Sequence, residues 1–173
     1  MQPRTGKILA MAQWPTFNPA APRNLASTRD IPVADVFEPG STAKSITVAA
    51  ALERGGQTPM SAYSIPNQIV VGGFPFHDAE SHPAGLHYTV AGILANSSNI
   101  GMVQVVQHVS PSTQYRYFRK FGIGSPTGLN LPGQTSGLLP VPSKWYGDTR
   151  YTLAFGQGVA VNAVQMALGA VYA

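Results

Sequence analysis

The sequence predicts an α+β domain in which helices outnumber strands. A short apolar run at residues 7–12 follows the turn-like Arg-Thr-Gly sequence, and this pattern is typical of a buried strand. Residues 42–54 predict a helix that is stopped by the glycine pair at 55–56. Residues 100–109 are apolar at 100, 103, 106 and 109, which is the spacing of a helix with one buried face.

The remaining elements follow from turn and cap signals. Residues 13–37 contain four prolines and predict loop, and residues 57–90 alternate apolar runs with Pro and Gly, which favours hairpins or irregular structure. A short helical segment is expected at 90–94. Ser110 followed by Pro111 predicts the start of a helix that runs through 121, because serine caps a helix and proline suits its first turn.

The C-terminal part predicts turns and then one more helix. Residues 123–150 are rich in turn formers. Asn162 and Gln165 have capping-box-like spacing ahead of apolar residues, which predicts a final helix. The chain ends inside this helical pattern without a stop signal, which suggests that it is a fragment.

Length and composition limit the possible classes of protein. The chain has 173 residues, enough for one domain or part of one, and 44% of them are hydrophobic while 10% are charged, which excludes a disordered chain. The formal net charge of +4 comes from scattered residues, so nucleic-acid binding is not expected. The absence of cysteine excludes thiol catalysis, disulfides and thiolate metal sites. Neither a membrane-spanning run nor a signal-peptide pattern is visible.

The clearest chemical motif is Ser41-Thr42-Ala43-Lys44 at the start of the 42–54 helix. Spacing of three residues puts Ser41 and Lys44 on one helix face. A serine hydroxyl becomes a strong nucleophile when a nearby base takes its proton, and a lysine with a lowered pKa can be that base. The helix N-terminus also offers N–H groups to an oxyanion. Ser-x-x-Lys also occurs by chance in many helices, but the preceding Glu-Pro-Gly turn favours the catalytic interpretation.

A second polar group, Ser97-Ser98-Asn99, precedes the predicted 100–109 helix. Taken alone it is a polar turn or a helix cap. Beside a Ser-x-x-Lys site, the Ser97 hydroxyl and the Asn99 amide could point together into a cleft, where one relays a proton and the other holds a peptide. His77, Asp78, Glu80 and His82 could ligate a metal, but their spacing matches no known helix-borne zinc motif, so we expect no metal site.

These motifs, in this order, resemble the transpeptidase domain of class B penicillin-binding proteins, and most closely the septal, cell-division type. The resemblance covers nearly the whole chain and is carried by residues 4–12, 34–44, 96–101, 117–124, 127–133, 136–140 and 155–158. It implies the penicillin-binding-protein/β-lactamase-like fold, here mostly its helical part plus one sheet strand. Residues 155–158 are expected to be structural.

The resemblance implies a peptidoglycan D,D-transpeptidase that is acylated by D-Ala-D-Ala stem peptides and inhibited by β-lactam antibiotics. By motif, Ser41 is the nucleophile, Lys44 the base that activates it and Ser97 a proton relay, and Asn99 binds the substrate amide. No cofactor is implied. The family also implies an extracytoplasmic domain at the cell membrane, with the anchor outside this chain, and partners among membrane glycosyltransferases and division proteins.

One family motif is missing. None of the four lysines begins a Lys-Thr-Gly sequence, and Arg4-Thr5-Gly6 is placed as a turn before the 7–12 strand. We therefore expect residues 1–173 to be an incomplete transpeptidase domain that lacks its first strand and its Lys-Thr-Gly strand, and to be a poor catalyst alone. Two alternatives stay open: a serine β-lactamase or β-lactam sensor with the same Ser-x-x-Lys core, and a non-catalytic binding fragment.

Overall fold

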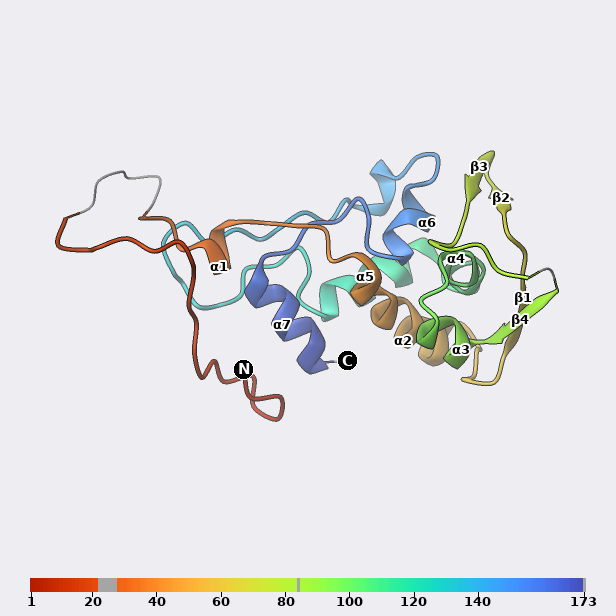
Figure 1. Ribbon diagram of the computed structural model, residues 1–173, viewed down its shortest axis with the longest axis horizontal. Coiled ribbons are helices and arrows are strands. Elements are labelled where there is room, and N and C mark those ends of the chain that lie inside the picture. Colours follow the sequence, from red (N-terminus) through yellow and green to blue (C-terminus); the bar gives the residue numbers. More distant parts are fainter. Residues whose placement is uncertain (22–27, 84, 173) are drawn as a thin grey trace.

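The computed structural model describes residues 1–21, 28–83 and 85–172, so part of the predicted 13–37 loop lies outside the described residues. Helices α2, α3, α4 and α6 lie toward the two strand pairs, α1 and α7 lie farther from them, and the N-terminal segment extends away from the helices (Figure 1). The helices are α1 (Ile31–Ala34), α2 (Lys44–Arg54), α3 (Val90–Ala95), α4 (Asn99–Val106), α5 (Pro111–Lys120), α6 (Thr149–Ala154) and α7 (Ala163–Tyr172), with 3-10 turns at Gly40–Ala43 and Pro142–Lys144.

The strands form two antiparallel pairs, which is the hairpin alternative of the two expected for residues 57–90. β1 (Ala62–Ile65) pairs with β4 (Leu86–Thr89), and β2 (Ile69–Val71) pairs with β3 (Phe74–Phe76). Gly72 and Gly73 connect β2 to β3, and both have positive φ, +61° and +86°. A two-residue hairpin turn of this kind needs positive φ at both positions, which glycine adopts without a Cβ penalty. Helices and paired strands occupy separate parts of the chain, in agreement with the predicted α+β class.

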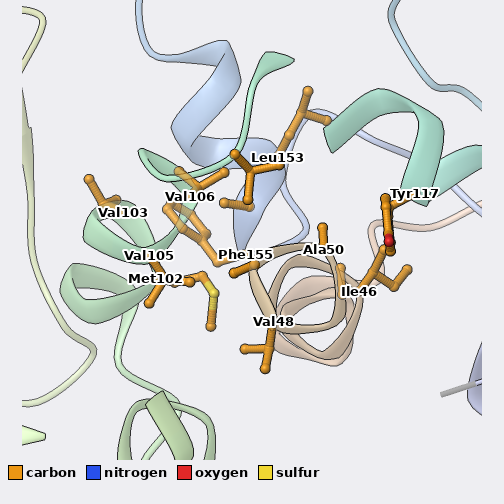
Figure 2. Close-up of a cluster of buried hydrophobic side chains, with 14 of the residues drawn as sticks. Ile46, Val48, Ala50, Met102, Val103, Val105, Val106, Tyr117, Leu153 and Phe155 are labelled. Carbon is orange, nitrogen blue, oxygen red and sulfur yellow. The ribbon is translucent and has the colours of Figure 1, made fainter. Parts of the chain in front are cut away.

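The core lies between α2, α4, α5 and α6. Side chains from these helices converge on one cluster (Figure 2), which includes Ile46, Met102, Tyr117 and Leu153. Helix α4 also approaches α3 closely, because Gly101 stands at their contact. A Cβ on Gly101 of α4 would lie 2.5–2.8 Å from side-chain carbons of Ile93 on α3. The core therefore fixes α3 and α4, and with them the turn that joins them, relative to α2.

The predicted helix caps are present. The Ser110 hydroxyl accepts a hydrogen bond from the Thr113 N–H at 3.2 Å at the start of α5. Before α7, the Asn162 N–H donates to Gln165 Oε1 at 2.9 Å and the Gln165 N–H donates to Asn162 Oδ1 at 2.8 Å. This reciprocal pair is a capping box, with Asn and Gln in the two positions. Local sequence signals thus predict these helix starts correctly.

The prediction of a buried strand at residues 7–12 is wrong. Leu9 is 67% exposed and Met11 is 42% exposed. No described residue pairs with this segment as a neighbouring strand. An extended segment cannot satisfy its own backbone hydrogen bonds, so an apolar run becomes a buried strand only where a partner strand is available.

Two short helices escape the sequence analysis. α1 lies inside the predicted loop and has four residues, and α6 begins inside the segment expected to consist of turns. Both helices have an aspartate at the N-cap, Asp30 and Asp148, but neither side chain makes a cap hydrogen bond. With four and six residues, the helices are also too short to show a helical apolar pattern. Among the described helices, none has the combined length and apolar character needed to cross a bilayer.

Candidate active site

Ser41 lies in the 3-10 turn that leads directly into α2, so Lys44 is the first residue of the α-helix itself. The turn is held from behind by the segment 155–158. The Gly40 N–H donates to the Gly156 carbonyl at 3.1 Å, and the Gly158 N–H donates to Glu38 Oε1 at 2.8 Å. A Cβ on Gly156 would lie 2.0 Å from the Gly40 carbonyl oxygen. The glycine-rich segment is therefore structural, and it supports the serine turn by direct backbone contact.

Lys44 is almost completely buried, with 1% of its surface exposed. Its ammonium group donates to the Ser97 carbonyl at 2.5 Å, the Ser97 hydroxyl at 3.0 Å and Asn99 Oδ1 at 2.7 Å. Burial lowers the pKa of Lys44 to about 8, and the nearby Asp78 carboxylate opposes this change. Loss of solvent disfavours the charged form of a lysine, so the amine loses its proton more easily than an exposed one.

Ser97 stands in the turn between α3 and α4 in a left-handed conformation, with φ at +54°. A non-glycine residue in this region carries a conformational cost of about 1–2 kcal/mol. The conformation turns both the carbonyl and the hydroxyl of Ser97 toward Lys44. The same hydroxyl donates to Ser41 Oγ at 2.9 Å. Ser97 Oγ therefore connects Ser41 to Lys44, and no direct hydrogen bond between Ser41 and Lys44 is present among the described contacts.

The bonding around Lys44 restricts the route of a proton. When the amine is neutral, its lone pair needs a donor. The Ser97 carbonyl and Asn99 Oδ1 can only accept, whereas the Ser97 hydroxyl can donate. In this arrangement a proton from Ser41 can pass to Ser97 Oγ while the Ser97 proton passes to Lys44 Nζ. The geometry therefore suits a relay through Ser97, with two coupled proton transfers, better than direct transfer from Ser41 to Lys44.

Asn99 begins α4, and both ends of its amide have protein partners. Oδ1 accepts from Lys44, and Nδ2 donates to the His77 carbonyl at 3.3 Å. The four residues proposed from the motifs, Ser41, Lys44, Ser97 and Asn99, thus lie together although the chain separates them by up to 58 positions. The amide of Asn99 contacts Lys44 rather than standing free in the cleft.

Sequence reasoning missed the role of Asp78. The Ser98 hydroxyl lies 3.1 and 2.9 Å from the two oxygens of this carboxylate, and the Ile100 N–H donates to Oδ1 at 2.9 Å. His82 Nε2 lies 3.7 Å from Oδ2. The described residues contain no group of three or more His, Cys, Asp or Glu side chains placed to hold a metal. A single Asp in an irregular segment gives no sequence signal for such a long-range cap.

A cleft of about 390 Å³ opens in front of these residues. Its lining includes Ser41, Ser97 and Asn99, and the loop after β3 adds Asp78, Glu80 and His82. The hydroxyl of Ser41 therefore faces an open, polar space, while the amine of Lys44 stays buried in the core. This separation lets a substrate reach Ser41 while Lys44 remains desolvated.

Comparison with known proteins identifies the family. Residues 1–170 match the family described as the penicillin binding protein transpeptidase domain. The chain belongs to this family. The resemblance seen in the sequence is thereby confirmed, and so is the expected fold class, because the family match covers nearly the whole chain.

Two curated relatives match nearly the whole chain. The penicillin-binding protein PbpB of Mycolicibacterium smegmatis is 38% identical over 167 residues, which cover 95% of this chain and 26% of PbpB. The peptidoglycan D,D-transpeptidase FtsI of Escherichia coli is 37% identical over 169 residues, which cover 94% of this chain and 27% of FtsI. The chain thus spans about a quarter of the length of these relatives.

A solved structure extends the comparison to three dimensions. Penicillin binding protein 3 of Mycobacterium tuberculosis in complex with aztreonam is 38% identical, with a TM-score of 0.74 over 79% of this chain and 30% of that one. At this identity the similarity concerns both fold and family.

Proposed function

We propose that the protein containing this chain is a peptidoglycan D,D-transpeptidase that acts through a serine acyl-enzyme and is inhibited by β-lactams. The observation that carries the proposal is the Ser97 hydroxyl, which lies 2.9 Å from Ser41 Oγ and 3.0 Å from Lys44 Nζ. A nucleophile, a relay and a desolvated amine in this order form an activated serine site. The FtsI relative carries the activity in its name, and the aztreonam complex is of a related protein.

In the proposed acylation, Ser41 Oγ attacks the carbonyl carbon of the penultimate D-Ala of a stem peptide. The Ser41 proton moves to Ser97 Oγ as the Ser97 proton moves to Lys44 Nζ. Reverse transfer gives a proton to the departing amine, the peptide bond breaks and the terminal D-Ala leaves. An amine of a neighbouring stem peptide then attacks the acyl carbon and passes a proton to Lys44 Nζ along the same route. The ester bond to Ser41 Oγ breaks, Ser41 Oγ takes the proton back through Ser97, and a new peptide bond joins the two stem peptides.

The location and partners of the whole protein are part of the same proposal. Its relatives named FtsI and PbpB support a role in septal wall synthesis at the outer side of the cell membrane. Partners there would be a membrane glycosyltransferase and division proteins. We propose further that the Lys-Thr-Gly motif, which this sequence does not contain, is supplied by other residues of the longer protein.

The nucleophile assignment is tested by Ser41→Ala in the full-length protein. This change should abolish covalent labelling by a fluorescent penicillin and leave thermal unfolding unchanged, because Ser41 stands at the cleft surface. Ser45→Ala is the matched control, since Ser45 lies one turn along, where its hydroxyl donates to the Thr42 carbonyl at 2.8 Å. It should keep the label. Labelling that survives Ser41→Ala would overturn the proposed function, and rapid loss of the label from the wild type would favour a β-lactamase.

A further inference from the structure

The Asp78 carboxylate is connected to the site through the first turn of α4. It receives hydrogen bonds from the Ser98 hydroxyl and from the Ile100 N–H. The Ser98 hydroxyl in turn accepts from the Gly101 N–H at 2.9 Å. Ser98 is buried between Ser97 and Asn99, the two residues that contact Lys44. Asp78 therefore fixes the residue in the middle of the turn that receives the lysine.

The charge of Asp78 acts on the same lysine. The turn between α3 and α4 presents Ser97 and Asn99 to Lys44, and neither carries a charge. Besides Asp78, the loop after β3 brings two further ionisable side chains to the cleft, Glu80 and His82, and β4 adds Tyr88. Asp78 is the charged group that raises the pKa of Lys44 against the effect of burial. A carboxylate near an ammonium group stabilises the charged form of the lysine.

We propose that Asp78 is a positioning residue for acylation: it holds the Ser97–Asn99 turn against Lys44 and keeps a negative charge beside the amine. This inference rests on the proposed function for its consequence in catalysis, but its physical basis is the set of contacts around Asp78. The hydrogen bonds hold the relay residues in place, and the charge limits how far burial lowers the pKa of Lys44.

The test separates charge from hydrogen bonding by comparing Asp78→Asn with Asp78→Ala in the full-length protein. Asn keeps an oxygen that can accept from the Ile100 N–H but has no charge. We expect Asp78→Asn to move the pH midpoint of penicillin acylation down by about one unit, because removal of an opposite charge favours the neutral amine. Asp78→Ala should also misplace the turn and lower the limiting rate by about 10²-fold, the effect typical of small misalignments in a reacting pair.

Titration of Lys44 by NMR of its ¹³Cε resonance gives a readout that does not depend on activity. Asp78→Asn should shift this titration down by the same amount as the acylation midpoint. Asp148→Asn is the matched control, since Asp148 precedes α6 and makes no side-chain cap hydrogen bond. It should change neither value.

The outcomes separate the two proposals. If wild-type protein is not acylated at all, the proposed function fails, while the titration still tests Asp78. An unchanged Lys44 titration in a folded Asp78→Asn variant would overturn the role of Asp78, whatever the acylation rate is.

Discussion

Leu153 on α6 is 1% exposed, whereas Leu9 in the N-terminal segment, residues 1–21, is 67% exposed. Both belong to short apolar stretches, and the difference comes from their backbones. A helix bonds its own N–H and C=O groups and needs only a neighbouring face to bury its apolar side, as α6 does against α4 (Figure 2). An extended segment needs a partner strand for the same result. The helical body, defined by α2 to α6, therefore assembles the site from residues of this chain, and the N-terminal segment contributes nothing to it.

The two regions should differ most in how much stability they lose when a glycine with positive φ is replaced by alanine. Each region contains at least one such glycine. Gly156 has φ +83°, and its added Cβ would lie 2.0 Å from the Gly40 carbonyl oxygen, whereas Gly6 has φ +67° and its Cβ would meet only a Leu168 side-chain carbon at 4.0 Å. Gly156→Ala adds a backbone clash to the strain of φ, and should lower the free energy of unfolding by about 4 kcal/mol. Gly6→Ala should cost about 1 kcal/mol. Chemical denaturation of both variants measures this, and equal costs would contradict the close support of the serine turn.

A leucine can be truncated to alanine in each region. Leu153→Ala should lower the free energy of unfolding by about 3 kcal/mol, because it leaves a cavity in the core. Leu9→Ala should change it by less than about 0.5 kcal/mol, the usual effect at an exposed position. Thermal and urea unfolding of the two variants would show the difference. A large loss of stability in Leu9→Ala would mean that the N-terminal segment is buried in the folded protein.

Within the helical body, two substitutions of Ser97 should reduce activity equally but differ in their effect on stability. Ser97→Ala and Ser97→Gly both remove the hydroxyl, and only glycine relieves the cost of the left-handed conformation. Both variants should lose penicillin acylation by about 10²–10⁴-fold, the usual contribution of a proton-transferring side chain. Ser97→Gly should be more stable than Ser97→Ala by about 1 kcal/mol. Acylation kinetics and unfolding are measured on the same samples, and near wild-type acylation in either variant would exclude the relay.

Local features of this molecule can be predicted from the sequence, whereas contacts between distant segments cannot. Signals that act within a few residues, such as the Ser110 cap and the Asn162–Gln165 box, predict helix starts correctly because the partners are local. The site residues Ser41, Lys44, Ser97 and Asn99 follow from the order of their motifs, but their hydrogen bonds do not, since these join positions more than 50 residues apart. The hydrogen bonds of Asp78 and the left-handed backbone at Ser97 depend on the packing of α3, α4 and the loop after β3. No local sequence pattern therefore predicts them.

We propose that burial makes Lys44 the final proton acceptor for Ser41. The most direct measurement is the pH dependence of the penicillin acylation rate constant for wild-type protein and for Lys44→Arg, with thermal unfolding to confirm that both are folded. Because the neutral amine accepts the proton and the pKa of Lys44 is about 8, the wild-type rate should rise with pH through a midpoint near 8. Arginine stays protonated, so Lys44→Arg should be slower by about 10²–10⁴-fold and show no such rise. A folded Lys44→Arg protein that is acylated at nearly the wild-type rate would show that positive charge alone is needed there, and would contradict this account.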